Sequence, residues 1–323
     1  MPATITHAYF AQDVYEVLPN ELHINLNLNK FRMFSQGTDP FMFYNIMNIN
    51  KGKDIRKLQY IFHTSKTKDY FINLINYIRD NYLYNDSDVK SFLFGFICHY
   101  VLDSTLHPFI IYKTGFFKKY DKETYKYNNL HTFMENFIDN DMVKRREKKN
   151  PYNFNFNEFC FDLNKFFTAL NKSIDYSYYS TYDINNLSEK YFVSLKQMKL
   201  FLNLFRKDRF GFKKIVYKTI DTFTSKKAFR LESISYHYPL EDKHNFLNSN
   251  NSLWRNPVEY KVTSHDSFIQ LYLKSIKIAK NIIINTDLFI KGKKKNLDDT
   301  FLNLSYLTGL DCNNKKEIRF FEF

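Results

Sequence analysis

Apolar residues recur every three or four positions along most of the chain, which is the spacing of amphipathic and buried helices. The first predicted helix begins near Thr4 and carries His7, Phe10, Val14 and Tyr15 at this spacing. The same recurrence predicts further helices over residues 41 into the fifties, 67–84, 86–106, 129–147, 159–174, 187–205, 209–227 and 266–285. The segment 237–262 contains Asn and Pro without a regular pattern, and we expect it to form a long irregular loop near a functional site.

Few residues interrupt these predicted helices. The 323 residues include only 7 Gly and 7 Pro, which favours long helices over strands and turns. The helix over 86–106 should open with Asp86 or Ser87 as N-cap and close at Pro108. We therefore predict an all-α fold, with residues 1–323 forming one multi-helix domain.

The predicted helix 86–106 is apolar nearly all round, which indicates a buried helix. His99, Asp103 and His107 follow one another at four-residue spacing, so a helix brings them to one narrow face. Unpaired imidazoles and carboxylates are costly to bury, and these residues therefore need strong partners. Imidazole nitrogens and carboxylate oxygens are typical zinc ligands.

A second pair, His131 and Glu135, repeats the four-residue spacing in the next predicted helix. All of the residues with this chemistry that we single out lie within the first 140 positions: His7, Asp39, His63, His99, Asp103, His107, His131 and Glu135. The remaining histidines have no ligand spacing and are interpreted as hydrogen-bonded core residues: His23, His237, His244 and His265. The first set predicts a metal site.

The chain is basic, with a formal net charge of +13 and runs of Lys and Arg at 144–149 and 291–295. Such runs usually form solvated faces. A basic surface also attracts phosphates, anionic lipid or nucleic acid at long range. The charge therefore suggests an anionic substrate, and an anionic membrane surface as a partner, without naming either. Nothing in the sequence indicates an obligate protein partner.

The cysteines and the apolar runs predict the cellular compartment of the protein. Cys98, Cys160 and Cys312 are far apart and form no Cys-x-x-Cys pair, which is typical of reduced core residues. Residues 1–7 have neither the basic start nor the apolar region of a signal peptide. The longest apolar run, residues 92–102, is too short to span a bilayer. We therefore expect a soluble cytoplasmic protein.

The order of these candidate ligands resembles the zinc-dependent phospholipase C family, to whose fold the nuclease P1 type is related. The resemblance covers roughly residues 5–140 and rests on His7, Asp39 in a Gly-Thr-Asp-Pro turn, His63, His99-x-x-x-Asp103-x-x-x-His107 and His131-x-x-x-Glu135. It implies the same helical fold and a zinc-dependent phosphodiesterase activity. Residues 140–323 have a suitable length and helical character but no motif that assigns them a role.

The resemblance also implies how the ligands are shared. One zinc would be held by Asp39, His63, His99 and Asp103, and a second by His107, His131 and Glu135. In secreted members an N-terminal tryptophan helps to hold a third zinc, together with the residues corresponding to His7 and Asp103. This chain begins with Met1 and Pro2, so we expect two zinc ions and a weak or absent third. The short, helical spacing from Asp103 to His107 is a second departure from the secreted enzymes.

Roles follow from the same comparison. Asp39 is the predicted catalytic residue, because a carboxylate on a turn can bind zinc and still accept a proton from the attacking water. His63 and His99 should be neutral and oriented by hydrogen-bond acceptors, for which Asp139 is a candidate. The resemblance would also place residues 254–257, Trp-Arg-Asn-Pro, in a late loop near the mouth of the site.

Three classes of function are compatible with these patterns. The first is a phospholipase C-like phosphodiesterase that releases a phosphorylated head group from a phospholipid or a soluble phosphodiester. The second is a P1-type single-strand nuclease, which the net charge would suit, although Glu135 stands where that type more often has aspartate. The third is a non-catalytic protein that zinc only stabilises. Eight ligands with one on a turn are typical of an open catalytic site, so the first class ranks highest.

Overall fold

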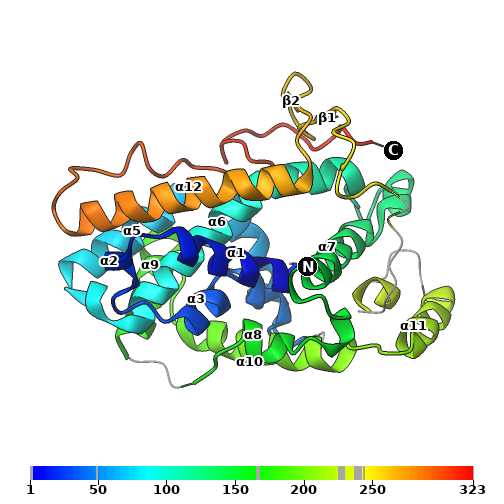
Figure 1. The fold of residues 1–323 in the computed structure, drawn as a ribbon, viewed down its shortest axis with the longest axis horizontal. Coiled ribbons are helices and arrows are strands. Elements are labelled where there is room, and N and C mark those ends of the chain that lie inside the picture. Colours follow the sequence, from blue (N-terminus) through cyan, green and yellow to red (C-terminus); the bar gives the residue numbers. More distant parts are fainter. Residues whose placement is uncertain are drawn as a thin grey trace.

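The computed structural model describes residues 3–48, 50–164, 168–224, 230–235, 242 and 244–322, and these residues are mostly helical (Figure 1). The α-helices are α1 (Thr4–Val17), α2 (Asn20–His23), α3 (Leu28–Phe34), α4 (Lys53–Thr64), α5 (Thr67–Asp80), α6 (Ser87–Thr114), α7 (Leu130–Glu147), α8 (Phe156–Cys160), α9 (Thr168–Tyr182), α10 (Leu187–Phe205), α11 (Phe212–Phe223) and α12 (Phe268–Ile290). Short 3-10 helices are η1 (Asp39–Phe43), η2 (Leu83–Asn85), η3 (Lys122–Tyr127), η4 (Pro151–Asn153) and η5 (Leu231–Ile234). The strands β1 (Trp254–Arg255) and β2 (Thr263–Ser264) pair antiparallel. The predicted all-α fold is confirmed.

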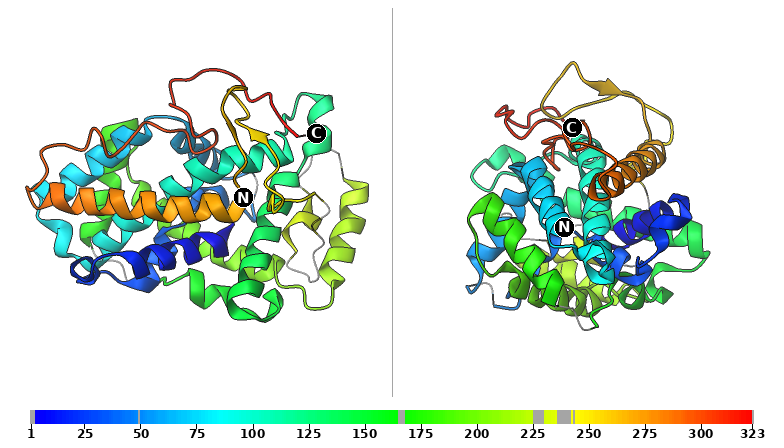
Figure 2. Two further views of the ribbon diagram at one scale, coloured as in Figure 1. Left: turned by 45° about the horizontal axis from the view of Figure 1, so that its top comes forward. Right: turned by 90° about the vertical axis from the view of Figure 1, so that its left-hand side faces the viewer.

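Helix α6 lies in the middle of the fold and packs against α1, α3, α7 and α12 (Figure 2). Its side chains are buried almost throughout, as the unbroken apolar sequence predicts. The helix opens at the predicted N-cap, where the carboxylate of Asp86 accepts hydrogen bonds from the amides of Asp88 and Val89.

The other end of α6 differs from the prediction, because the helix continues past Pro108 to Thr114. A proline inside a helix costs about 3 kcal/mol, since it lacks an amide hydrogen and crowds the preceding turn. The side chains that follow, Phe109, Ile110 and Ile111, are buried, and burying each of them contributes about 1.5–3 kcal/mol. Continuing the helix therefore costs less than exposing them, and the three candidate ligands of α6 keep a common face.

Two other predicted helices are interrupted. Between residue 41 and the fifties the chain forms η1, a series of turns and then α4, because Asn45 and Gly52 adopt left-handed conformations with φ of 52° and 76°. In the predicted helix 159–174, Phe161 is extended with a φ of −136°, residues 165–167 lie outside the described residues, and α9 is described from Thr168. Residues 225–227, at the end of the predicted helix 209–227, lie outside the described residues.

One continuous apolar core joins the helices, and the C-terminal segment packs onto it. The ring of Phe301 stacks on that of Phe71, with centroids 4.7 Å apart, and the Tyr100 hydroxyl donates to the backbone oxygen of Leu302 at 2.9 Å. Residues 297–322 follow α12 without forming another helix and run back over the bundle (Figure 1). None of the described helices has the combined length and apolarity that a membrane-crossing segment requires.

Candidate metal centre

Helix α6 supplies three of the candidate ligands, all buried. His99, Asp103 and His107 project from successive turns of its one face. The Nε2 atom of His99 lies 3.4 Å from Oδ2 of Asp103, and Nδ1 of His107 lies 3.6 Å from the same oxygen. The other oxygen of Asp103, Oδ1, lies 3.1 Å from Nε2 of His7. The two oxygens of one carboxylate thus face different imidazoles.

His7 lies in the first turns of α1, and a carboxylate from another helix fixes the start of α1. Asp139 on α7 accepts hydrogen bonds from the amides of Ile5 and Thr6, at 3.2 and 2.8 Å, and pairs with Arg206 at 3.4 Å. The first amides of a helix have no partner within it, and a negative charge there is stabilising. Asp139 therefore holds the turn that carries His7 against α7.

His63, near the end of α4, is oriented by its own helix. Its Nδ1 donates to the backbone oxygen of Gln59 at 2.8 Å, because a carbonyl can only accept. Nε2 then faces Oδ1 of Asp39 at 3.2 Å and Oδ2 of Asp103 at 3.4 Å. The backbone oxygen of Gln59 thus has the orienting role that the sequence suggested for Asp139. The carboxylate of Asp139, on α7, instead accepts hydrogen bonds from the first amides of α1.

Asp39 follows a tight turn in which Gly37 packs directly against the ring of His99. Gly37 has a φ of +53°, and a Cβ at this position would lie 2.0 Å from Cδ2 of His99. Only glycine fits both this conformation and this approach. The ligand atoms of four residues lie within 4.8 Å of one another: His7, Asp39, His99 and Asp103. With His63, these residues are called the Asp103 group below.

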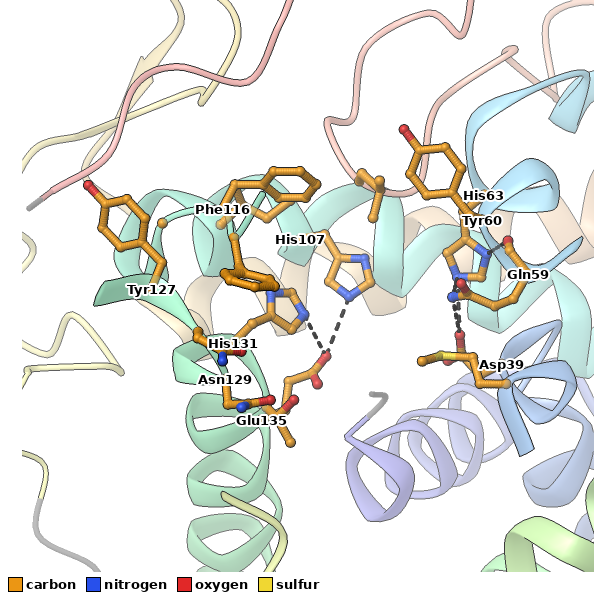
Figure 3. A pocket seen from close by; sticks show the side chains of 17 residues that line it. Asp39, Gln59, Tyr60, His63, His107, Phe116, Tyr127, Asn129, His131 and Glu135 are labelled. Carbon is orange, nitrogen blue, oxygen red and sulfur yellow. Dashed lines mark hydrogen bonds and ion pairs between the residues drawn. The ribbon is translucent and has the colours of Figure 1, made fainter. Parts of the chain in front are cut away.

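A second cluster, the Glu135 group, consists of His107, His131 and Glu135. Nε2 of His131 lies 3.1 Å from Oε1 of Glu135, and Nε2 of His107 lies 3.5 Å from the same oxygen (Figure 3). Nδ1 of His107 donates to the backbone oxygen of Tyr306 at 3.0 Å, which leaves the lone pair of Nε2 facing the group. The three ligand atoms lie within 4.8 Å of one another.

A cavity of about 400 Å³ opens onto both groups (Figure 3). Asp39 and His63 line it on one side, and the three residues of the Glu135 group line it on the other. The rest of its wall includes many apolar side chains: Met42, Ile111, Phe116, Phe117, Tyr127 and Leu307. A reactant in this cavity would meet both clusters at once.

The described part of the loop expected at the mouth of the site does not line this cavity. Residues 237–241 and 243 of the predicted loop, with His237, lie outside the described residues. Among the loop residues that are described, 242 and 244–262, none lines the cavity. Trp254 packs instead on Phe109, with ring centroids 5.4 Å apart.

Buried polar atoms without hydrogen bonds indicate that the Asp103 group fits a cation. Within the described parts of the chain, both ring nitrogens of His99, Nδ1 of His7 and Oδ2 of Asp103 are buried and make no hydrogen bond. Each such atom costs about 1–3 kcal/mol if nothing binds it. Imidazole nitrogens and carboxylate oxygens that converge on one point are a donor set that suits zinc.

The pKa values of the ionisable side chains also indicate that the site suits a cation. Burial lowers the pKa of His99 to about 4, which keeps the ring neutral, as a metal ligand must be. Burial also acts on His63, but the carboxylates of Asp103 and Asp39 outweigh it and raise the pKa of this ring to about 9. The neutral ring predicted for His63 is therefore favoured at pH 7 only where a cation replaces its proton. Despite burial, His99 and His63 hold the pKa of Asp39 below its usual value. The carboxylates are thus ionised and favour positive charge between them.

Two residues of the site were not predicted. The side-chain amide of Gln59 donates to Oδ1 of Asp39 at 3.0 Å and lines the cavity. Tyr306 holds His107 through its backbone oxygen, and its own amide donates to the backbone oxygen of His63 at 2.8 Å. Gln59 lies one helical turn before His63 on α4, a spacing that could have revealed it. Tyr306 has no such signal, because it lies far along the chain in a segment without periodicity.

The fold and the site together define an all-α protein with a buried centre of histidines and carboxylates suited to zinc. A family model, zinc dependent phospholipase C, matches residues 6–204. The chain therefore belongs to the zinc-dependent phospholipase C family. The match extends the resemblance seen in the motifs from α7 to the end of α10. No significant match to a curated protein or to a solved structure was found. Family membership and the two clusters support zinc as the cofactor.

Proposed function

We propose that the protein is a zinc-dependent phosphodiester hydrolase of the phospholipase C type, which releases a phosphorylated head group by attack of water on phosphorus. The observation that carries this proposal is a cavity that residues of both ligand groups line, Asp39 and His63 from one group and all three residues of the other. Phosphodiester hydrolysis needs positive charge on the attacking and on the leaving side of one phosphate, and two adjacent cation sites supply it. A purely structural zinc site would be closed by four protein ligands and would have no need of a cavity.

The Asp103 group would hold one zinc and the Glu135 group a second. The Glu135 group offers only three protein ligands, which is typical of a catalytic site with an open position. Bound zinc supplies a water whose pKa falls to about 7 and positive charge that stabilises the phosphate oxygens. The side chains of the chain itself hold these ions, orient the water and exclude other solvent.

Asp39 is the proposed general base. It lines the cavity, and its Oδ1 is approached by Nε2 of His63 at 3.2 Å and by the amide of Gln59 at 3.0 Å. Because Oδ1 has these partners, the proton of the attacking water would go to Oδ2. The lowered pKa of Asp39 keeps the carboxylate ionised before the reaction.

The proposed substrate is a phospholipid. The apolar side chains of Met42, Ile111 and Leu307 lie in the same wall as the ligands, and they would contact the glycerol and acyl portion next to the phosphate. A soluble phosphodiester with a small alcohol would leave this surface in water. Hydrolysis should therefore be faster for a phospholipid than for a glycerophosphodiester with the same head group.

The test combines one substitution with a substrate panel. Asp39→Asn keeps the shape of the side chain and one oxygen for the metal, but it accepts a proton poorly. We expect it to retain its zinc and fold and to lose a factor of about 10² to 10⁴ in rate, the usual contribution of a general base. Asp54→Asn, on the same stretch of chain but with its side chain 98% exposed, is the matched control and should be fully active.

The panel consists of phosphatidylcholine in mixed micelles, glycerophosphocholine and single-stranded DNA, each with and without a chelator. Release of phosphocholine from the lipid that the chelator abolishes is the expected result. Hydrolysis of DNA alone would overturn the lipid assignment in favour of a nuclease. An Asp39→Asn protein that hydrolyses every substrate at the wild-type rate with its zinc bound would refute the role of Asp39.

A further inference from the structure

Helix α11 presents its apolar face to solvent. Five large side chains lie on one side of this helix or at the turn before it, and all are at least half exposed: Phe210 at 76%, Phe212 at 72%, Ile215 at 65%, Val216 at 50% and Phe223 at 87%. Positions 212, 215, 216 and 223 fall on one helical face at 3.6 residues per turn. A surface helix normally turns this face inward. The arrangement of α11 is the reverse.

The polar face of α11 explains why the helix lies this way. The buried carboxylate of Asp208 accepts hydrogen bonds from the amides of Lys213 and Lys214, at 3.2 and 2.8 Å, and so fixes the start of the helix. Near its end, Asp221 accepts hydrogen bonds from the amides of Leu231 and Glu232, both at 3.0 Å. These contacts hold the inner face to the protein, and they commit the apolar face to the outside.

The contacts that anchor α11 connect it, through η5, to α7, the helix that carries Glu135. The segment η5 packs on both α11 and α7. The side-chain amide of Asn136 donates to the backbone oxygens of Ser233 and Ser235, at 3.2 and 2.8 Å, and Asn136 is the neighbour of Glu135 on α7. Figure 1 shows α11 at the same end of the molecule as the C-terminal end of α6, where the cavity residues Gly115, Phe116 and Phe117 follow. The exposed face is thus built onto the helix that carries the Glu135 group.

The charges around this face are mostly positive; Glu232 on η5, 4.0 Å from Nζ of Lys214, is an exception. Besides Arg206, which is buried and pairs with Asp139, the stretch 206–224 contains five cationic residues: Lys207, Arg209, Lys213, Lys214 and Lys218. Its only acidic residues are Asp208 and Asp221, which are buried at the inner side of the helix. An apolar helical face rich in phenylalanine and flanked by Lys and Arg is the pattern of helices that lie in the interface of anionic membranes.

We propose that α11 and the turn before it form a docking surface for anionic lipid bilayers. The apolar side chains enter the boundary between head groups and acyl chains, while the flanking cations contact lipid phosphates. The helix lies outside residues 6–204, which the family model matches. Docking does not depend on hydrolysis, because it uses none of the candidate ligands. It would complement a phospholipid substrate by bringing the cavity to the membrane.

Sedimentation with vesicles tests this surface without turnover. The purified full-length protein is mixed with vesicles of phosphatidylcholine alone or with about 30% phosphatidylglycerol, in low and high salt. We expect binding to the anionic vesicles that weakens as salt rises. The double variant Phe212→Ser/Phe223→Ser should bind these vesicles at least about tenfold more weakly, because it removes two of the inserted side chains.

Two further variants separate the contributions. Leu273→Ser removes a side chain that is 54% exposed on α12, away from the docking surface, and should bind like the wild type. Lys218→Glu keeps the apolar face and should weaken binding to anionic vesicles only. Circular dichroism and zinc content confirm that each variant is folded.

Equal binding by the Phe212→Ser/Phe223→Ser protein and the wild type would overturn the proposal. So would a wild-type protein that binds no vesicles and elutes as a dimer that this variant converts to a monomer. In that case the face joins two copies of the chain. Loss of lipid hydrolysis at Asp39 variants has no bearing on these outcomes, so failure of the proposed reaction and failure of docking remain distinguishable.

Discussion

Replacing Gly37 by alanine should damage the metal centre through a single methyl group. The new Cβ would lie 2.0 Å from Cδ2 of His99, whereas ordinary contact begins at 3.4 Å, so the ring must retreat by about 1.4 Å. Metal ligands have to hold their distances to within about 0.2 Å. His99 displaced this far can no longer bind the ion that the rest of the Asp103 group holds.

Two costs add in the folded protein. Alanine at a left-handed φ of +53° costs about 1–2 kcal/mol, and forcing extra volume into a packed site costs about 1–3 kcal/mol more. Gly37→Ala should therefore lower the free energy of unfolding by about 2–5 kcal/mol, a large part of the stability of an ordinary domain. Urea unfolding followed by circular dichroism measures this loss, and elemental analysis measures the zinc that remains.

Gly292→Ala is the matched control for the backbone alone. Gly292 has a φ of +72°, and nothing lies within 4 Å of its missing Cβ. This variant should lose only about 1–2 kcal/mol and keep all of its zinc. If Gly37→Ala loses no more stability than Gly292→Ala and binds as much zinc, then the turn does not press on His99 and the geometry described for the site is wrong.

Three further predictions concern the metal and the helix that carries His7. Protein reconstituted with zinc should hold about two ions per chain and should melt at a lower temperature with a chelator, because binding energy is partly folding energy; less than one ion by elemental analysis would contradict both ligand groups. His131→Ala removes one of three ligands from the Glu135 group, so about one ion should be lost together with activity, whereas His265→Ala, outside both groups, should keep both ions. Asp139→Asn should destabilise the protein by about 2–3 kcal/mol in urea, since a buried charge that accepts amide hydrogen bonds and pairs with Arg206 is lost; an unfolding curve equal to that of Asp54→Asn would refute this role.

The sequence was most informative where local spacing determines geometry. The four-residue steps from His99 to Asp103 and His107, and from His131 to Glu135, place these residues on helical faces wherever the helices pack. The fold class followed from the same periodicity and the scarcity of glycine and proline. The predicted end of α6 at Pro108 was wrong, because the burial of the residues after it is a tertiary effect that the local rule for proline does not include.

Contacts between distant segments were not predictable. Nothing near Tyr306 marks it as the partner of His107, since the link uses a backbone oxygen that every residue has. Asp139 was assigned to the wrong partner for a similar reason, because its position on α7 does not reveal which helix start lies beside it. The outward orientation of the apolar face of α11 could not be predicted either, because the periodicity of this helix is that of an ordinary amphipathic helix.

The hydrogen bonds of Tyr306 have a consequence for biosynthesis. During translation, every candidate ligand from His7 to Glu135 leaves the ribosomal exit tunnel long before residue 306 does. Until then His107 lacks the carbonyl that selects its tautomer, and the backbone oxygen of His63 lacks the amide of Tyr306. A nascent chain should therefore hold zinc loosely, and tight retention of the metal should begin only after the segment that carries Tyr306 has folded back onto α4 and α6.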